Sequence, residues 1–201
     1  MSFDGNSGFL AQAGLALDPT QMDYERMETA VTEFLDALGV DLTTESMRDT
    51  PRRVAIAFSE LLTPEPFDAT TFPNEGYDEL VVARSIQFHS LCEHHLLPFH
   101  GVAHVGYLPG ERIVGLSKLG RVVEYYARRL QLQERMTVQI ADWIEENLHP
   151  RGVGVVLEAE HLCMSLRGVQ KPGTMTVTSA LHGLVRDDAR TRQEFLSFTR
   201  S

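Results

Sequence analysis

The segment SLCEHHLLPFH, Ser90 to His100, places one cysteine and three histidines within nine positions. Thiolate sulfur and imidazole nitrogen are ligand atoms that zinc prefers. In the C-x-x-H pattern, Cys92 and His95 fall on one turn, close enough to hold one ion. The spacing alone leaves two interpretations open, a metal site and a strand that merely contains histidines.

A second sulfur comes from Cys163, far along the chain, and it is the only other cysteine. Cys92, His95 and Cys163 together would give three protein ligands and leave the fourth tetrahedral position open, as a catalytic zinc site requires. A structural site would need a fourth ligand, and His94 or His161 could supply it. Both kinds of metal site therefore remain open at this level.

The segment GVGVVLEAEHLCMSLRG, residues 152–168, is expected to be one strand. Because side chains alternate between the two faces of a strand, one face would carry a polar row. The members of that row would be His161, Cys163, Ser165 and Arg167. The opposite, core-facing row would be Leu162, Met164 and Leu166. An exposed polar face with a chance histidine is the alternative interpretation.

Two further segments could bind an anionic or amidine-like ligand. In GLSKLGR, Lys118 and Arg121 lie one turn apart near an expected helix start, with Ser117 as the candidate cap, and such a start suits phosphate oxygens. In QLQERM, the Glu134 carboxylate could accept two hydrogen bonds from a planar N–H edge such as that of guanine. The alternatives are a solvated basic patch and an ordinary surface glutamate.

Hydrophobic periodicity predicts the elements that must position these residues. Helices are expected over 20–40, 50–62, 117–130 and 134–148, with a last one that begins at Asp187 or Asp188 and continues through Phe195. Thr50 is the expected cap of the second helix and Pro51 its first residue. Strands are expected over 79–92, 101–110, 152–168 and 173–184, and residues 63–76 read as a loop. This order predicts an α+β fold with an antiparallel sheet.

Composition narrows the function class. The formal net charge of −10 argues against broad binding to nucleic acid or to an anionic membrane. Two cysteines do not make a disulfide scaffold, and no apolar run reaches membrane-spanning length. Residues 1–19 read as a flexible tail and not as a signal peptide. A cytoplasmic enzyme or binding protein is expected.

Three segments resemble the GTP cyclohydrolase I family: CEHHLLPFHGVAHVGYLP, GLSKLGRVVEYYARRLQLQERMT and GVGVVLEAEHLCMSLRGVQKPGTMTVTS. The resemblance runs from about Thr20 to Arg200. It implies a tunnelling fold, in which a four-stranded antiparallel sheet carries a two-helix insert, preceded by an N-terminal helical extension. Residues 20–75 would form that extension and its loop, and residues 76–201 the catalytic domain. It also implies pentameric barrels that stack into a homodecamer, with active sites at subunit interfaces.

The resemblance also assigns roles to residues. Cys92, His95 and Cys163 match the ligands of a Zn²⁺ ion, and His94 and His161 match catalytic histidines. The positions that match substrate-binding residues are Glu134, Ser117, Lys118, Arg121, Arg167 and Arg53. One position departs from the family pattern, because Ile56 stands where a lysine that faces the triphosphate is frequent. His100 and His104 match no catalytic role and are expected to face solvent or a subunit contact.

The activity implied is hydrolysis of GTP at guanine C8, with release of formate and rearrangement of the ribose to give 7,8-dihydroneopterin triphosphate. His161 is the expected proton donor to N7, and His94 is expected to shuttle protons in ring opening. The main alternative is a zinc-stabilised relative that binds purine nucleotide without turnover. A deazapurine nitrile reductase and a nucleic-acid-binding zinc module fit the cysteine pattern and the charge less well.

Overall fold

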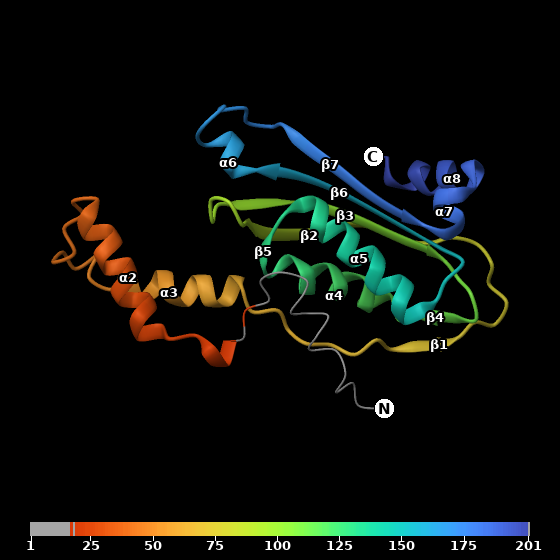
Figure 1. Cartoon of the computed structure of the whole chain (residues 1–201), viewed down its shortest axis with the longest axis horizontal. Helices are drawn as coiled ribbons and strands as arrows, with labels where there is room; N and C mark the ends of the chain where they lie inside the picture. The colour runs from red at the N-terminus through yellow and green to blue at the C-terminus, as the bar shows by residue number, and fades with distance from the viewer. Residues whose placement is uncertain (1–16, 18, 201) are drawn as a thin grey trace. The chain divides into compact units, whose positions relative to one another are not determined.

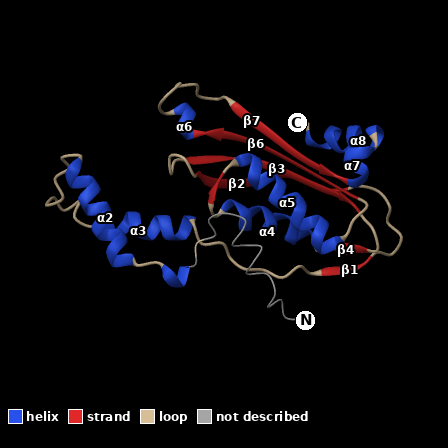
Figure 2. Ribbon diagram, in the orientation of Figure 1, coloured by secondary structure: helices blue, strands red, loops and turns tan. Residues whose placement is uncertain are grey.

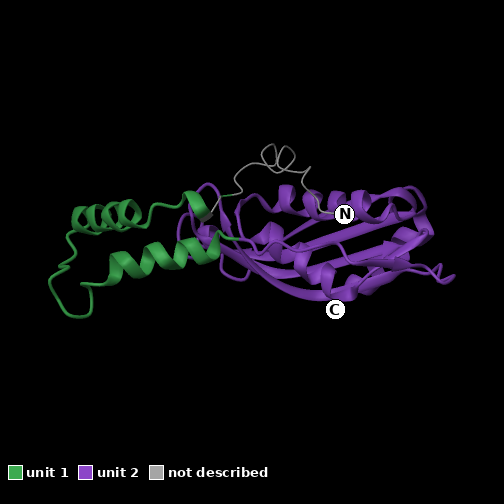
Figure 3. Ribbon diagram, turned by 90° about the horizontal axis from the view of Figure 1, so that it is seen from below, with its two compact units in different colours: residues 1–63 green, residues 64–201 purple. Residues whose placement is uncertain are grey.

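A computed structural model describes residue 17 and residues 19–200 of the chain (Figure 1). The chain divides into two compact units, one that ends at Thr63 and one that begins at Pro64 (Figure 3). The tail expected over residues 1–19 falls mainly on residues 1–16 and 18, which lie outside the described residues. No helix in the described part is long and apolar enough to cross a membrane.

The first unit is a helical hairpin. Its elements are the 3₁₀ helix η1 (Pro19–Gln21), α2 (Tyr24–Ala37) and α3 (Thr50–Leu61). The Asp23 carboxylate caps α2 by accepting from the Arg26 amide at 3.0 Å. In α3 the cap position belongs to Asp49 rather than to the expected Thr50, and the proline lies in the first turn, where its missing N–H costs no hydrogen bond.

The second unit is built on a five-stranded sheet with the order β5-β2-β3-β6-β7 (Figure 2). The strands are β2 (Val81–Cys92), β3 (Pro98–Leu108), β5 (Leu130–Gln131), β6 (Gly152–His161) and β7 (Met175–His182). Four of them, β2, β3, β6 and β7, pair antiparallel, and the short β5 runs parallel to the end of β2. The expected α+β fold with an antiparallel sheet is confirmed.

Two helices, α4 (Leu116–Ala127) and α5 (Gln133–Leu148), lie between β3 and β6 in the chain and cover one face of the sheet (Figure 1). The main core cluster fills the space between these helices and the sheet. It includes Phe99, Val123, Ile140 and Val155, none of which is exposed. Burial of these apolar side chains is the principal force that holds the helices on the sheet.

The short α7 (Gly183–Asp187) and the C-terminal α8 (Ala189–Thr199) bring a second, smaller cluster to the other face of the sheet, around Val156, Val185 and Phe195. A Cβ atom at Gly106 or Gly154 would lie 2.9 or 2.5 Å from the Phe195 ring. Only glycine therefore lets α8 pack this closely on β3 and β6. Asp188 caps α8 by accepting from the Thr191 amide at 2.8 Å, as one of the two expected alternatives.

The expected strand over residues 152–168 is too long. β6 ends at His161, and the chain continues in the short helix α6 (Leu162–Ser165). The expected two rows of side chains therefore do not continue beyond His161. Leu166, placed in the core-facing row, is 68% exposed. Cys163, placed in the polar row, packs against the main core cluster.

Smaller differences concern the loops and caps. The expected loop over residues 63–76 contains β1 (Thr71–Pro73), which pairs with β4 (Arg112–Val114). Gly115, not Ser117, occupies the cap position of α4. His104 does not face solvent within this chain. It is buried at 2% exposure, and its Nδ1 accepts from the Ser85 amide at 3.4 Å.

Candidate active site

The C-x-x-H segment forms the tight turn that connects β2 to β3. The Cys92 amide donates to the Leu97 carbonyl at 2.9 Å, and the amides of His95 and Leu96 donate back to the Cys92 carbonyl at 3.2 and 2.9 Å. Leu96 takes a left-handed conformation with φ of 55°, which closes the turn. This turn holds two exposed histidines beside a buried cysteine.

The side-chain atoms of this turn lie at distances suited to a shared ion. The Cys92 Sγ atom is 3.9 Å from His94 Nδ1 and 3.8 Å from His95 Nδ1. One ligand atom from each residue lies within 4.8 Å of the other two. A sulfur and a nitrogen bound tetrahedrally to one zinc ion would be separated by about 3.6 Å. The residues present therefore fit a zinc ion.

The second sulfur reaches the same place from α6. Burial raises the pKa of the Cys163 thiol, and the neighbouring Cys92 sulfur raises it further by charge and by hydrogen bonding. Arg167 acts in the opposite direction on that pKa. Cys92 and Cys163 are both free thiols. Two sulfurs from distant parts of the chain thus meet beside the histidines of the turn.

His161, the last residue of β6, lies between a ring and an amide. Its imidazole stacks on Phe99, with ring centroids 4.6 Å apart and planes 3° from parallel, and its Nε2 lies 2.8 Å from Gln133 Oε1. Burial lowers the pKa of His161, and the negative charge of Glu134 partly opposes that lowering. Glu134 therefore lies near enough for its charge to act on His161.

Gln133, which the sequence interpretation overlooked, determines which His161 nitrogen carries hydrogen. Its buried amide nitrogen donates to the Thr176 carbonyl at 2.9 Å and to the Leu157 carbonyl at 3.2 Å. Because carbonyls only accept, the Gln133 amide cannot flip, and its oxygen must face His161. The hydrogen of the neutral imidazole is consequently on Nε2, and Nδ1 carries the free lone pair.

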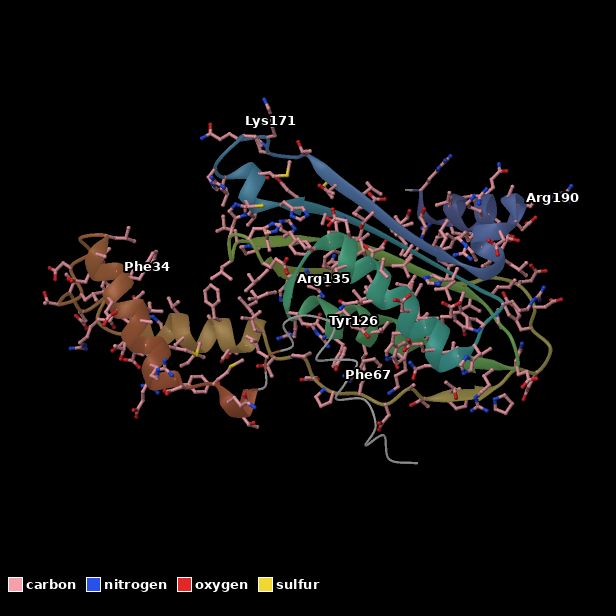
Figure 4. The ribbon with its side chains drawn as sticks, viewed as in Figure 1. Phe34, Phe67, Tyr126, Arg135, Lys171 and Arg190 are labelled. Atoms are coloured by element: carbon pink, nitrogen blue, oxygen red, sulfur yellow. The ribbon has the colours of Figure 1, made fainter. Side chains whose placement is uncertain are left out.

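A second overlooked group supports His94. Arg135, labelled on α5 in Figure 4, donates to both Glu93 carboxylate oxygens at 2.8 and 3.0 Å. This bond lowers the pKa of Glu93. The charged Glu93 lies 4.0 Å from His94 Nε2. An ionised carboxylate in this position can orient the imidazole.

The expected substrate-binding cations take several positions. Within the second unit, the Lys118 ammonium lies 5.9 Å from the centroid of the Phe67 ring, labelled in Figure 4. Arg121 pairs with Glu65 at 3.5 Å. Arg167 is exposed after α6, where its charge acts on Cys163.

Ser117 and Glu134 lie in the first turns of α4 and α5, and both are exposed. Arg53 belongs to the first unit, where it donates to the Ser46 carbonyl at 2.9 Å and to the Thr50 hydroxyl at 2.8 Å. Ile56 lies on the same helix and is 38% exposed. The structure thus brings both cysteines to His94 and His95, and it places Glu134 near His161.

Comparison with known proteins identifies relatives over most of this sequence. The family model described as GTP cyclohydrolase I matches residues 27–200. The chain is 50% identical to "GTP cyclohydrolase 1" of Aquifex aeolicus over 180 residues, 89% of this chain and 98% of the relative. It is 53% identical to "GTP cyclohydrolase 1" of Streptomyces coelicolor over 184 residues, 88% of this chain and 90% of the relative.

A solved structure, the apo form of the archaeosine synthase QueF-Like, matches with a TM-score of 0.43 and 18% identity. The match covers 53% of this chain and 96% of that one. This similarity is too weak to assign a fold.

Proposed function

We propose that Cys92, His95 and Cys163 hold the metal ion of the active site. The premise is that the chain belongs to the GTP cyclohydrolase I family, as the family model and its relatives show. As a member of that family, the chain is an enzyme, a GTP cyclohydrolase that hydrolyses GTP. The observation that carries the proposal is the approach of Cys92 to both His95 and Cys163. His94 lies at a similar distance, and the family resemblance assigns it to proton transfer instead.

The donor set fits Zn²⁺, because two thiolates and one imidazole leave a tetrahedral position open. When bound, zinc would supply Lewis acidity and make hydroxide available near neutral pH for hydrolysis at guanine C8. The remaining steps fall to the side chains of the chain itself.

His161 would deliver a proton to N7 of guanine as C8 is attacked, because loss of aromaticity leaves negative charge on that nitrogen. The Gln133 contact occupies Nε2, so Nδ1 is the atom that exchanges a proton with the substrate. Stacking on Phe99 fixes the plane of the ring. A positioned histidine with a pKa near the working pH typically contributes a rate factor of about 10²–10⁴.

His94 would move protons during ring opening, and the Arg135-bound carboxylate of Glu93 would orient it. Glu134 would accept hydrogen bonds from the N1–H and the exocyclic amine of guanine. Its charge would at the same time favour the protonated form of His161.

The triphosphate would be bound by cations from several elements. We assign this role to Lys118, Arg121, Arg167 and Arg53, with Ser117 near the ribose. The ion pair between Arg121 and Glu65 is exposed and therefore contributes little stability. Arg121 can leave Glu65 and bind a phosphate at a small cost in free energy. The product would be 7,8-dihydroneopterin triphosphate with formate.

The alternative is a relative that binds purine nucleotide without turnover, and a direct assay separates the two. Full-length enzyme with measured zinc content is incubated with GTP, and formate and the pterin product are quantified. Stoichiometric formate supports the cyclohydrolase, and nucleotide binding without formate supports the alternative. His161→Ala is the matched control, because it should retain zinc and lose formate release.

We further propose a tunnelling fold that assembles into pentameric barrels and a decamer, with residues 20–75 as the helical extension and residues 76–201 as the catalytic domain. The supporting feature is β7, an outer strand of the sheet whose Met175 and Val177 are 47% and 58% exposed. Open edges of this kind favour pairing with another strand. The two free thiols fit a reducing compartment, and we place the enzyme in the cytoplasm.

A further inference from the structure

The described residues contain a second cluster of metal-ligating side chains besides the one at the β2–β3 turn. It consists of Asp142, Glu145 and His182, and one ligand atom from each lies within 4.8 Å of the other two. The carboxylates lie one helical turn apart on α5, and the histidine is the last residue of β7. None of the three is used in the proposed hydrolysis of GTP.

The cluster lies toward the other end of α5 from the candidate active site. α5 begins at Gln133, beside His161, and proceeds past Asp142 and Glu145 to Leu148. In the register of β6 with β7, His182 pairs with Val153 near the start of β6, whereas His161 is the last residue of β6. The two clusters are thus separated by most of the length of a strand.

In the absence of metal, the cluster is an ion triad in which each nitrogen of His182 faces one carboxylate. His182 Nδ1 is 2.6 Å from Glu145 Oε2, and His182 Nε2 is 3.4 Å from Asp142 Oδ1. Two ligands on one zinc-like ion lie at most about 4.2 Å apart, given metal–ligand distances of about 2.1 Å. An ion bound by one imidazole nitrogen and the two carboxylates would therefore replace the hydrogen-bonded contact between His182 and Glu145, and all three side chains already lie within its reach.

The electrostatics of the cluster favour a cation. Burial raises the pKa of Asp142, the negative charge of Glu145 raises it further, and His182 acts in the opposite direction. The side chains of His182 and Asp142 are only 21% and 34% exposed, so water screens the two carboxylates incompletely. One imidazole cannot neutralise both carboxylates, even when it is protonated.

The backbone around the histidine is fixed independently of the cluster. The Leu184 amide donates to the Arg151 carbonyl at 2.9 Å, and Gly152 bridges to Gly183. A Cβ atom at Gly183 would lie 2.4 Å from the Arg151 carbonyl oxygen, so only glycine permits this approach. His182 is therefore presented to α5 from a rigid strand end.

We propose that Asp142, Glu145 and His182 form a second divalent-cation site, which takes Mn²⁺ or Zn²⁺ and ties α5 to the end of β7. One imidazole nitrogen with two carboxylate oxygens is a harder donor set than the cysteine-rich active site, and it suits manganese as well as zinc. Bound metal would stabilise the folded chain, since it binds the native state and not the unfolded one.

The test uses the full-length enzyme with its zinc content measured, titrated with Mn²⁺ and followed by the electron paramagnetic resonance signal of free Mn²⁺. The wild type should bind one additional Mn²⁺ per chain. Glu145→Gln and His182→Ala should each weaken that binding by about 100-fold or more, because loss of a direct ligand should exceed the 10–100-fold typical of outer contacts. Formate release from GTP should be unchanged in both variants, which also shows that they fold.

The matched control is Glu146→Gln, which removes the same charge from the adjacent exposed position of α5. It should bind Mn²⁺ as the wild type does. Absence of Mn²⁺ binding by the wild type would overturn the proposal. The three side chains would then form only an ion triad, with His182 between the two carboxylates. Equal weakening by Glu145→Gln and Glu146→Gln would also overturn it, because the effect would then be one of general charge.

Discussion

The two ends of α5 differ in what they bring to the sheet. At the first end, Gln133 lies within hydrogen-bond distance of His161, and Arg135 donates to Glu93 beside His94. At the other end, Asp142 and Glu145 face His182 directly. The first end of α5 thus contacts residues of the candidate active site. The other end itself contributes two carboxylates, which are harder metal ligands than cysteine sulfur.

The difference in donor atoms explains how the ends can have separate roles. The first cluster combines cysteine sulfur with imidazole and has a buried cysteine at its base, which favours a tightly held soft or borderline metal. The second cluster combines two carboxylates with imidazole at partial exposure, which favours weaker and exchangeable binding. Substitutions at the two ends should therefore affect different measurements.

The largest effect is expected from Cys163→Ala. Loss of one of three metal ligands should remove the zinc and reduce formate release to background, because both depend on the same ion. Zinc is measured by mass spectrometry and formate by an enzymatic assay on the same sample. Leu166→Ala, on the exposed side just after α6, should change neither. Formate release at the wild-type rate in Cys163→Ala would remove Cys163 from the site.

His161→Ala should separate metal binding from catalysis. We expect full zinc content with kcat reduced by about 10²–10⁴-fold, since a positioned proton donor is lost while the ligands remain. The comparison is with His89→Ala, an exposed histidine on β2. A reduction of less than tenfold in kcat would mean that another group protonates N7.

Glu134→Ala should act on substrate binding. Loss of hydrogen bonds between a charged carboxylate and guanine, about 1.5–3 kcal/mol each, should raise KM for GTP by at least about tenfold. Steady-state kinetics with GTP provide the measurement, and Glu146→Ala on the same helix is the control. An unchanged KM would place guanine away from the start of α5.

The smallest effect is expected at the second end of α5. It is the change in Tm caused by Asp142→Asn in chelator-treated protein. The folded-state pKa of Asp142 is raised above 3.8 by burial, so protonated Asp142 contributes stability that is present at acid pH. That stability is lost as the pH rises through the folded-state pKa. The asparagine variant should therefore have a Tm equal to or slightly above that of the wild type at neutral pH.

The difference in Tm should shrink toward acid pH, and thermal unfolding followed by circular dichroism at several pH values measures it. A variant that is less stable than the metal-free wild type at neutral pH would show that the ion pair with His182 outweighs the cost of burial.

The comparison of the two ends also shows what the sequence could predict. The C-x-x-H turn, the helix that starts at a proline and the break between α4 and α5 follow from local spacing, so the sequence predicted them. The end of β6 was predicted wrongly, because four residues that alternate between polar and apolar fit a strand and a helical turn equally well. The bond from the Leu166 amide to the Leu162 carbonyl, at 3.0 Å, shows that the chain takes the helical turn.

Residues whose role depends on a distant partner left no signal in the sequence. Gln133 acts through His161, 28 residues away, and it has neither charge nor metal affinity to mark it. The spacing of Asp142 and Glu145 on a helix gave no sign of a site, because only the fold places His182 of β7 beside them. His104 was expected to face solvent or a subunit contact, because alternation along a strand does not reveal that the bulge in β2 brings the Ser85 amide to its imidazole.

The central claim is that Cys92, His95 and Cys163 converge on one ion. X-ray absorption at the zinc edge of the full-length enzyme, loaded with one zinc per chain, tests it directly. The account predicts two sulfurs at about 2.3 Å, one imidazole nitrogen and one light atom that is not a second imidazole. A single sulfur, or a second imidazole in the fourth position, would contradict it.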